Sequence, residues 1–317
     1  MFQLNNSIEF KTIIARMYIR VIIYCFSTRF LEVKMFKQLE EYVRPDSLKD
    51  ALAILDKKKD AAKILAGGTA VMVSHNAGVK TLVDIKHLGL NKIKKEGKDM
   101  KIGAAVTISQ LLQNPLIQKY CGGLLYQSAY FIASTPLRNM ITLGGNIVSV
   151  YPWSDLPVAL LLSDAKVIIA GKEKTRTVSY RELLKKHPAQ NIAKNEIVTD
   201  IILPDAAGYS GAFVKYAKTS FDLAMLDVGV TAKIKGREFE DVRFAISAIG
   251  PLPQMLNESA GMLIGCKTND AAAIEKAAAK ASVEAKFMSD KRVSIEYKKE
   301  ILPVLIRRLV EKIVEEK

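Results

Sequence analysis

Two pairs of adjacent glycines restrict the fold of this chain more than any other feature of its sequence. They stand in LAGGTAVMV (residues 65–73) and ITLGGNIVSV (residues 141–150), with Gly68 and Gly144 76 residues apart. Each pair follows an apolar run that indicates a strand, and each has a hydroxyl residue beside it. Glycine adopts positive φ and lets backbone N–H groups approach a ligand with no Cβ in the way, which suits a diphosphate. Together the two segments fit one long anionic cofactor, although either pair alone is more typical of a tight turn.

Several common classes of site are not indicated. Neither glycine pair matches G-x-G-x-x-G or G-x-x-x-x-G-K-[ST], so the sequence predicts neither a Rossmann domain nor a P-loop. Cys25, Cys121 and Cys266 lie far apart with no C-x-x-C, which argues against a disulfide framework and against a zinc or iron–sulfur site within the chain. The three histidines have no metal-ligand spacing. This cysteine usage favours a reducing compartment, and we expect a cytoplasmic protein.

The formal net charge of +14 raises the question of nucleic-acid binding. The basic residues are not gathered in one stripe: segments such as DKKKDAAK and RELLKKHPAQ mix them with acids and are typical of exposed faces and loops. We therefore expect no nucleic-acid partner. An acidic protein partner or a lysine-rich proteome explains the charge better.

The first 34 residues differ from the rest of the chain. TIIARMYIRVIIYCF is apolar but carries Arg16 and Arg20, and it is shorter than the roughly 20 apolar residues that cross a bilayer. No signal-peptide cleavage site follows it. Met35 opens MFKQLEEYVRPDSLKDALAIL, which resembles a natural start. We interpret residues 1–34 as an N-terminal extension or a misassigned start, with a peripheral membrane helix as the alternative and no membrane insertion expected.

The remaining pattern predicts an α+β chain. A helix that Ser47 caps and the strands KILAGG and TLVDIK form a βαβ-like unit, followed by the strand MKIGAAVT, a helix from Thr107, a helix around LLYQSAYFIAS, and the strands AKVIIAG and EIVTDIILP. After Pro204, GAFVKYAK, LDVGVTAKI and DVRFAISAIG alternate like three antiparallel strands, and two helices follow. We divide the body into residues 35–207, with subdomains of about 35–87 and 88–207, and residues 208–317.

Four segments in this order carry a resemblance to a known family: AGGTA, STPLRNMITLGGNI, PWSDLPVALLLSDAKVII and FVKYAKTSFDLAML. Together they resemble the FAD-binding, or medium, subunit of the molybdenum hydroxylases, the family of xanthine dehydrogenase and of carbon monoxide dehydrogenase. T-x-G-G-N followed by P-x-S-D is the specific part. The resemblance runs from Met35 nearly to the C-terminus and implies a two-subdomain FAD-binding fold of the PCMH, or vanillyl-alcohol-oxidase, type, followed by a smaller C-terminal domain.

The resemblance also implies which residues bind FAD. AGGTA would be the first diphosphate segment and TLGGN the second, Asp155 and Lys215 would contact the cofactor, and Ile132 and Val198 would flank the isoalloxazine ring. The implied cofactor-binding residues are Ala66, Gly67, Gly68, Thr69, Ala70, Ile132, Thr142, Leu143, Gly144, Gly145, Asn146, Asp155, Val198 and Lys215.

Simpler interpretations of four of these residues stay open. Asp155 would cap the helix LPVALLL, Lys215 would be a solvated strand residue, and Ile132 and Val198 would belong to the core. The chain also departs from the family. Ala70 stands where many relatives carry an acid or a serine, Lys218 replaces a common arginine, and the cysteine-rich insertion of some relatives is lacking.

The implied function is electron transfer. FAD, held without a covalent bond, would take electrons from iron–sulfur clusters on a small subunit, a large subunit with a molybdenum cofactor would hydroxylate the substrate, and an external acceptor would receive the electrons. No catalytic acid, base or metal ligand is expected in this chain. Two alternatives remain: a self-sufficient flavin-dependent oxidoreductase of the same fold, and a scaffold that has lost FAD. The sequence identifies neither the substrate nor the acceptor.

Overall fold

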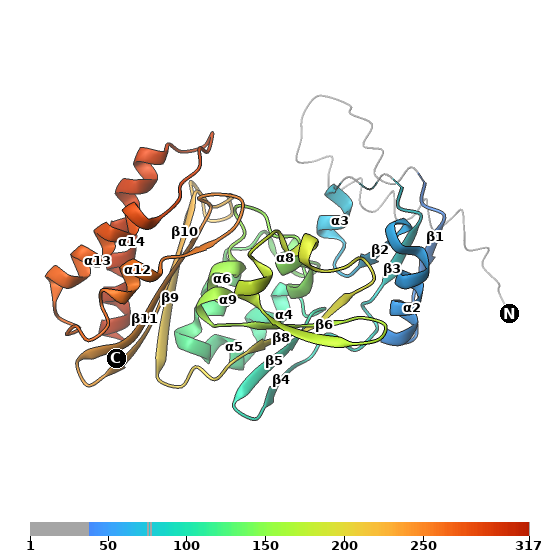
Figure 1. Cartoon of the computed structure of the whole chain (residues 1–317), viewed down its shortest axis with the longest axis horizontal. Coiled ribbons are helices and arrows are strands. Elements are labelled where there is room, and N and C mark those ends of the chain that lie inside the picture. The colour runs from blue at the N-terminus through green and yellow to red at the C-terminus, as the bar shows by residue number, and fades with distance from the viewer. Residues whose placement is uncertain (1–37, 75, 77, 317) are drawn as a thin grey trace. The chain divides into compact units, whose positions relative to one another are not determined.

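The computed structural model describes residues 38–74, 76 and 78–316 (Figure 1). The expected N-terminal extension, residues 1–34, lies outside the described residues, as does the alternative of a peripheral membrane helix there. Of the helices that the structure describes, none is both long enough and apolar enough to cross a bilayer.

A parallel three-stranded sheet begins the described chain. Its strands are β1 (Glu41–Val43), β2 (Ala62–Leu65) and β3 (Thr81–Asp84), in the order β1-β3-β2. Between them run helix α2 (Leu48–Lys58), the 3₁₀ turn η1 (Lys59–Ala61) and helix α3 (Thr69–Val73). Ser47 caps α2 as expected, by accepting a hydrogen bond from the backbone N–H of Asp50. The βαβ-like unit predicted from the sequence therefore forms.

A five-stranded antiparallel sheet follows in the order β4-β5-β8-β6-β7. Its strands are β4 (Ile93–Glu96), β5 (Asp99–Gly103), β6 (Lys166–Ala170), β7 (Thr175–Ser179) and β8 (Ile197–Leu203). Between β5 and β6 lie α4 (Ile108–Gln113), α5 (Pro115–Lys119), η2 (Tyr120–Gly123), α6 (Leu124–Tyr130), α7 (Thr135–Arg138), α8 (Leu143–Val148) and α9 (Leu156–Leu162). Between β7 and β8 lie α10 (Tyr180–Leu183) and α11 (Pro188–Asn191).

The C-terminal sheet has four antiparallel strands, in the order β12-β11-β10-β9. They are β9 (Tyr209–Tyr216), β10 (Leu226–Lys235), β11 (Glu238–Ser247) and β12 (Gln254–Met255), followed by helices α12 (Asn257–Gly261), α13 (Ala271–Glu284) and α14 (Ile295–Glu315). The prediction of three strands was wrong because β12 has only two residues, too few to show an alternating pattern.

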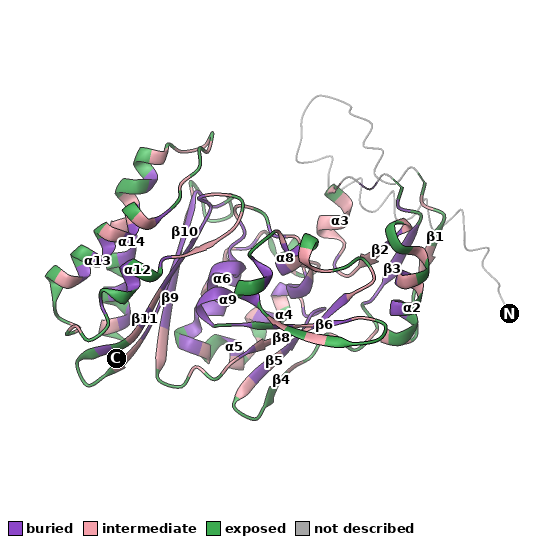
Figure 2. Cartoon of the chain, viewed as in Figure 1, coloured by how far each residue is buried: buried purple, intermediate pink, exposed green. Residues whose placement is uncertain are grey.

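Helix α9 packs against the C-terminal sheet at β10 and β11. All of its residues, from Leu156 to Leu162, are buried, and Figure 2 shows α6 and α9 largely in the colour of buried residues. A Cβ on Gly229 of β10 would lie 2.6 Å from Leu162 Cδ1 and 2.7 Å from Val158 Cγ1. The helix therefore rests on the sheet at a position where any larger residue would force Leu162 and Val158 to shift.

We expect Gly229→Ala to destabilise the fold by about 1–3 kcal/mol, because the added methyl group overpacks a closed contact. Denaturant unfolding measures the loss. Gly261→Ala is the matched control, since Gly261 ends α12 and a Cβ there meets no described atom within 4 Å. A Gly229→Ala protein as stable as the control would show that α9 does not pack this closely.

Candidate functional site

The first glycine segment forms the turn between β2 and α3. Gly68 precedes α3 in a left-handed conformation, with φ of 78°, which favours glycine over residues with a side chain. No described side chain caps α3. The N–H groups of its first turn, at Thr69 and Ala70, therefore have no acceptor within the helix, and both residues are partly accessible.

The two glycine segments meet at their backbones. A Cβ on Gly67 would lie 1.8 Å from the carbonyl oxygen of Met140 and 3.3 Å from the backbone nitrogen of Thr142. Any side chain at residue 67 would separate the segments. The structure thus brings together two stretches that the sequence analysis linked only through one long ligand.

The second pair differs from its sequence-based description, because it does not end a strand. Gly144 and Gly145 lie in the first turn of α8, and the Thr142 hydroxyl caps this helix by accepting from the Gly145 N–H at 3.2 Å. The turn after α7 ends at Met140, so only Ile141 lies between this turn and the cap residue Thr142. One residue is too short for a strand. Outside the chain neighbours and backbone of its own helix, the only described atom within 4 Å of a Cβ added at Gly145 is Thr142 Oγ1, at 2.8 Å.

Most backbone donors of the second segment are already used within the protein. The N–H groups of Leu143 and Gly144 donate to the carbonyls of Val106 and Ala104, each at 2.8 Å, and the Asn146 N–H donates to Thr142 O at 2.9 Å. Side-chain groups remain: the Thr142 hydroxyl hydrogen and the Asn146 amide, whose Oδ1 is buried without a hydrogen-bond partner among the described residues. A buried polar atom without a partner is costly, so Asn146 fits a ligand that donates a hydrogen bond.

Ile132 and Val198 both lie in the main core. Each is 7% exposed, and both belong to the apolar cluster that contains Leu143. Val198 pairs with Ile169 at a shift in register between β6 and β8. Ala133, beside Ile132, has φ of 47°, a conformation uncommon for alanine. No sequence signal indicated this local strain, which occurs directly after one of the expected flavin contacts.

Asp155 and Lys215 form a buried ion pair. Asp155 stands at the N-cap position of α9, yet its side chain makes no capping hydrogen bond with the described chain, and Lys215 lies on β9. Lys215 Nζ lies 3.4 Å from Asp155 Oδ1, with side-chain exposures of 5% and 7%, and donates to the Phe131 carbonyl at 3.2 Å. Burial raises the pKa of Asp155, while Lys215 opposes this shift. The simpler interpretations of the two residues, as a cap and as a solvated lysine, were wrong.

The sequence analysis missed Asp227, a second carboxyl group in this cluster. Asp227 on β10 is paired with Lys215 on β9 in the sheet register and is fully buried. Burial, and then the charge of Asp155, hold the pKa of Asp227 well above its usual value. An acid within the otherwise apolar run AMLDVGV was the available signal.

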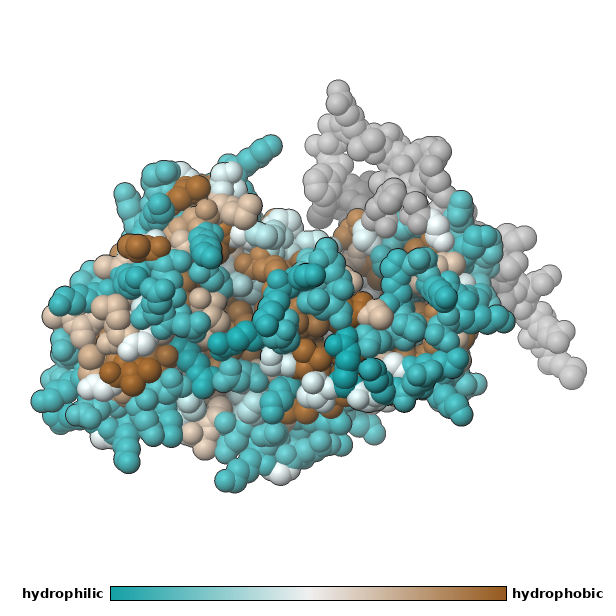
Figure 3. All heavy atoms as spheres, in the orientation of Figure 1, coloured by the Kyte–Doolittle hydropathy of each residue, from teal (hydrophilic) through white to brown (hydrophobic). Residues whose placement is uncertain are grey.

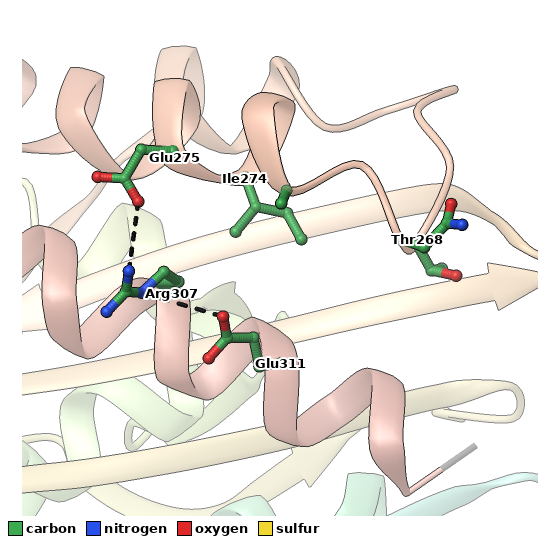
Figure 4. Close-up of a pocket in the computed structure, with 7 residues that line it drawn as sticks. Thr268, Ile274, Glu275, Arg307 and Glu311 are labelled. Atoms are coloured by element: carbon green, nitrogen blue, oxygen red, sulfur yellow. Dashed lines mark ion pairs between the residues drawn. The ribbon is translucent and has the colours of Figure 1, made fainter.

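A pocket of about 260 Å³ lies elsewhere, where Thr268 and Asn269 approach α13 and α14 (Figure 4). Arg307 projects toward Glu275 and Glu311 there, at 3.7 Å and 3.9 Å. None of the expected FAD-binding residues lines this pocket. It is therefore separate from the candidate site.

Comparisons with known proteins agree with this arrangement. Residues 34–206 match the family model described as the FAD binding domain in molybdopterin dehydrogenase, and residues 212–313 match the CO dehydrogenase flavoprotein C-terminal domain. The chain is 31% identical to the glyceraldehyde dehydrogenase medium chain of Sulfolobus acidocaldarius, over 83% of this chain and 94% of that one. It is 28% identical to the carbon monoxide dehydrogenase medium chain of Afipia carboxidovorans, over 86% and 96% of the two chains.

A solved structure of reconstituted CO dehydrogenase from Oligotropha carboxidovorans superposes with a TM-score of 0.81 at 27% identity, covering 88% of this chain and 98% of that chain. The match thus extends through both family models and nearly the whole described fold. The chain belongs to the family of FAD-binding medium subunits of the molybdenum hydroxylases, which also includes the medium chain of carbon monoxide dehydrogenase and the FAD-binding subunit of xanthine dehydrogenase.

Proposed function

We propose that this chain is the FAD-binding electron-transfer subunit of a molybdenum-containing hydroxylase or dehydrogenase complex. It takes electrons from iron–sulfur clusters on a partner subunit and passes them to an external acceptor. The observation that supports this most directly is the backbone contact between the two glycine segments at Gly67. It brings donors from two distant parts of the chain close together, as binding one diphosphate from both segments requires.

The chain's own groups fit FAD. The N–H groups of Thr69 and Ala70 lie at an uncapped turn and suit the diphosphate. The Thr142 hydroxyl and the Asn146 amide would supply side-chain hydrogen bonds, and the buried Leu143 and Gly144 would fix the position of these two residues through their hydrogen bonds to Val106 and Ala104. Bound FAD supplies the chemistry, which is the exchange of electrons one or two at a time.

Further groups would surround the flavin end of the cofactor. Ile132 and Val198 would exclude water from the faces of the ring. The ammonium group of Lys215, fixed by Asp155 and the Phe131 carbonyl, would place a positive charge beside it. Ala66, Gly67, Gly68 and Gly145 complete the proposed set by keeping Cβ atoms and bulky side chains away from the diphosphate.

The partners follow from the family: an iron–sulfur small subunit and a large subunit with the molybdenum cofactor. The excess of basic residues, with a formal net charge of +14, would favour acidic surfaces on these partners. On the face drawn in Figure 3, hydrophilic residues predominate and apolar ones form small separate patches. Association that depends on such exposed charges weakens as the salt concentration rises.

We expect the chain to hold FAD without a covalent bond. Acid precipitation of the purified yellow protein should release all of the flavin into the supernatant, where chromatography identifies it as FAD and not FMN. Flavin that stays in the washed pellet would contradict non-covalent binding. A colourless protein that does not take up added FAD would contradict the proposed function.

Gly145→Val should abolish FAD retention in a chain that still folds. Outside its own helix and chain neighbours, a Cβ at this position meets only the Thr142 hydroxyl, at 2.8 Å, so we expect the main cost to the fold to be the loss of one helix cap, about 0.5–2 kcal/mol. The same side chain would occupy space that the diphosphate needs. Flavin absorbance per chain and far-UV circular dichroism measure the two effects, with Gly261→Ala as the FAD-retaining control. Stoichiometric FAD in the valine variant would show that the second segment does not bind the diphosphate.

Purification from the native host should yield this chain together with an iron–sulfur subunit and a molybdenum-containing subunit. Metal analysis and mass spectrometry of the complex check this, and rising salt should release the medium chain. An isolated monomer that reduces its flavin directly with an organic substrate would instead establish a self-sufficient flavoenzyme.

A further inference from the structure

Three polar side chains form a row across the C-terminal sheet. The register pairs Asp227 on β10 with Lys215 on β9 and with Ser247 on β11. Residues that pair directly across neighbouring strands project from the same face of a sheet. Asp155, at the start of α9, meets this row from the helix side, because it lies close to both Lys215 and Asp227.

The charges in this cluster do not balance without an added proton. It holds the carboxyl groups of Asp155 and Asp227 and one ammonium group, that of Lys215, all nearly or fully buried. Two carboxylates would leave one uncompensated negative charge away from water, which is strongly unfavourable. One proton on the carboxyl pair makes the cluster neutral.

The hydrogen bonding leads to the same conclusion. Asp155 Oδ1 and Asp227 Oδ1 are both buried and, among the described residues, lack a hydrogen-bond partner. Lys215 Nζ is near enough to Asp155 Oδ1 for an ion pair, but the two groups are not aligned as a hydrogen bond. The two carboxyl groups lie within hydrogen-bonding reach of each other, so a proton on one turns it into a donor for the other.

Ser247 also contacts the carboxyl group of Asp227. Its hydroxyl oxygen lies 2.8 Å from Asp227 Oδ2 and 3.2 Å from the Ser154 carbonyl. A hydroxyl group has only one hydrogen to donate. Donation from Ser247 to Asp227 lowers the pKa of that carboxyl group, but burial and the charge of Asp155 outweigh this effect. Lys298, a buried lysine near the start of α14, has other partners, since it donates to the Ala248 carbonyl and pairs with Asp290.

We propose that Asp227 is a positioning residue of the flavin site, which keeps the single proton shared with Asp155 and so leaves Asp155 as the one carboxylate that neutralises and fixes Lys215. The consequence for the cofactor rests on the proposed function, but the protonation itself does not. The raised pKa values of both carboxyl groups have the direction that this arrangement requires.

The arrangement has a definite effect on stability. An acid whose pKa is higher in the folded than in the unfolded chain binds more protons when folded, so stability falls as the pH rises from the unfolded value toward the folded one. Asp227→Asn removes this penalty, because asparagine resembles the protonated acid and does not ionise. The melting temperature of the variant relative to the native chain should therefore increase with pH.

The first test compares the full native chain with Asp227→Asn between about pH 5 and about pH 8. Over this range, the melting temperature of Asp227→Asn minus that of the native chain should rise by about 2 °C or more, a clear effect for a chain of this size. Asp270→Asn is the control, because Asp270 caps α13 at an exposed position and asparagine caps equally well. The melting temperature of this control relative to the native chain should stay constant over the same pH range. A constant difference for Asp227→Asn would overturn the proposal.

Infrared spectroscopy observes the proton directly. At about pH 7.5 the native chain should show the carbonyl stretch of a protonated carboxylic acid, shifted in heavy water and absent from Asp227→Asn. It should also be absent from Asp155→Asn, because Asp227 then ionises to neutralise Lys215. A native chain without this band, or a band that persists in Asp227→Asn, would contradict the shared proton.

A double variant tests the role in positioning. Each single asparagine variant keeps one acid to balance Lys215, whereas Asp155→Asn with Asp227→Asn leaves the lysine buried without a counter-ion. Each variant changes the FAD dissociation constant by some factor relative to the native chain. We expect the factor for the double variant to exceed the product of the two single-variant factors by about tenfold or more, which corresponds to the free energy of one pKa unit. Multiplicative effects would show that Asp227 has only a structural role. Should the chain bind no FAD, the melting and infrared experiments still decide the protonation, so the two proposals fail separately.

Discussion

The burial of α9 is the constraint on which the candidate site depends. This helix, Leu156–Leu162, is apolar throughout and has no exposed face, so it has to be covered on every side. The C-terminal sheet supplies one cover at Gly229, and the core around α6 supplies another. Because the helix is held this closely, the residue that precedes it, Asp155, is carried to the row formed by Lys215 and Asp227. An acid and a lysine from distant parts of the chain thus meet out of contact with water.

The four glycines of the two pairs have different physical roles. Gly68 supplies a left-handed turn, Gly67 permits the contact with Met140, and Gly144 packs against Ala104, whose Cβ would lie 2.6 Å from an added Cβ. Three of the four are therefore required by the fold itself. Gly145 has no positive φ, and outside its own helix and chain neighbours an added Cβ there would meet only the Thr142 hydroxyl, at 2.8 Å. A substitution at Gly145 can therefore affect ligand binding without preventing the chain from folding.

Much of the fold could be predicted because its signals are local. The caps at Ser47 and Thr107 and the alternation in β9, β10 and β11 are written in short stretches of sequence. The strand β12 could not be predicted, since two residues show no period, and α8 was misread as a strand end because its glycines oppose helix formation. A helix cap and tertiary hydrogen bonds to Val106 and Ala104 outweigh that propensity.

Sequence analysis could identify residues of the candidate site only where they belong to a recognisable motif. The glycine segments and Asp155 follow from the family resemblance, and their roles in binding FAD stay predictions. Asp227 escaped because its importance comes from strand register: a lone acid in an apolar run acquires a partner only when β9 and β10 align it with Lys215. Ala133 escaped for a similar reason, since its strained backbone is set by tertiary packing.

The carboxyl pair spans the two family models, because Asp155 lies in the first and Asp227 in the second. The charge near the proposed flavin is thus assembled by both parts of the chain. The C-terminal part is more than a cover that could be exchanged freely between relatives. In a chimera that joined residues 34–206 to another C-terminal domain, Asp155 would face a lysine and a strand register from a different relative. Modularity in sequence does not extend to the electrostatics of the site.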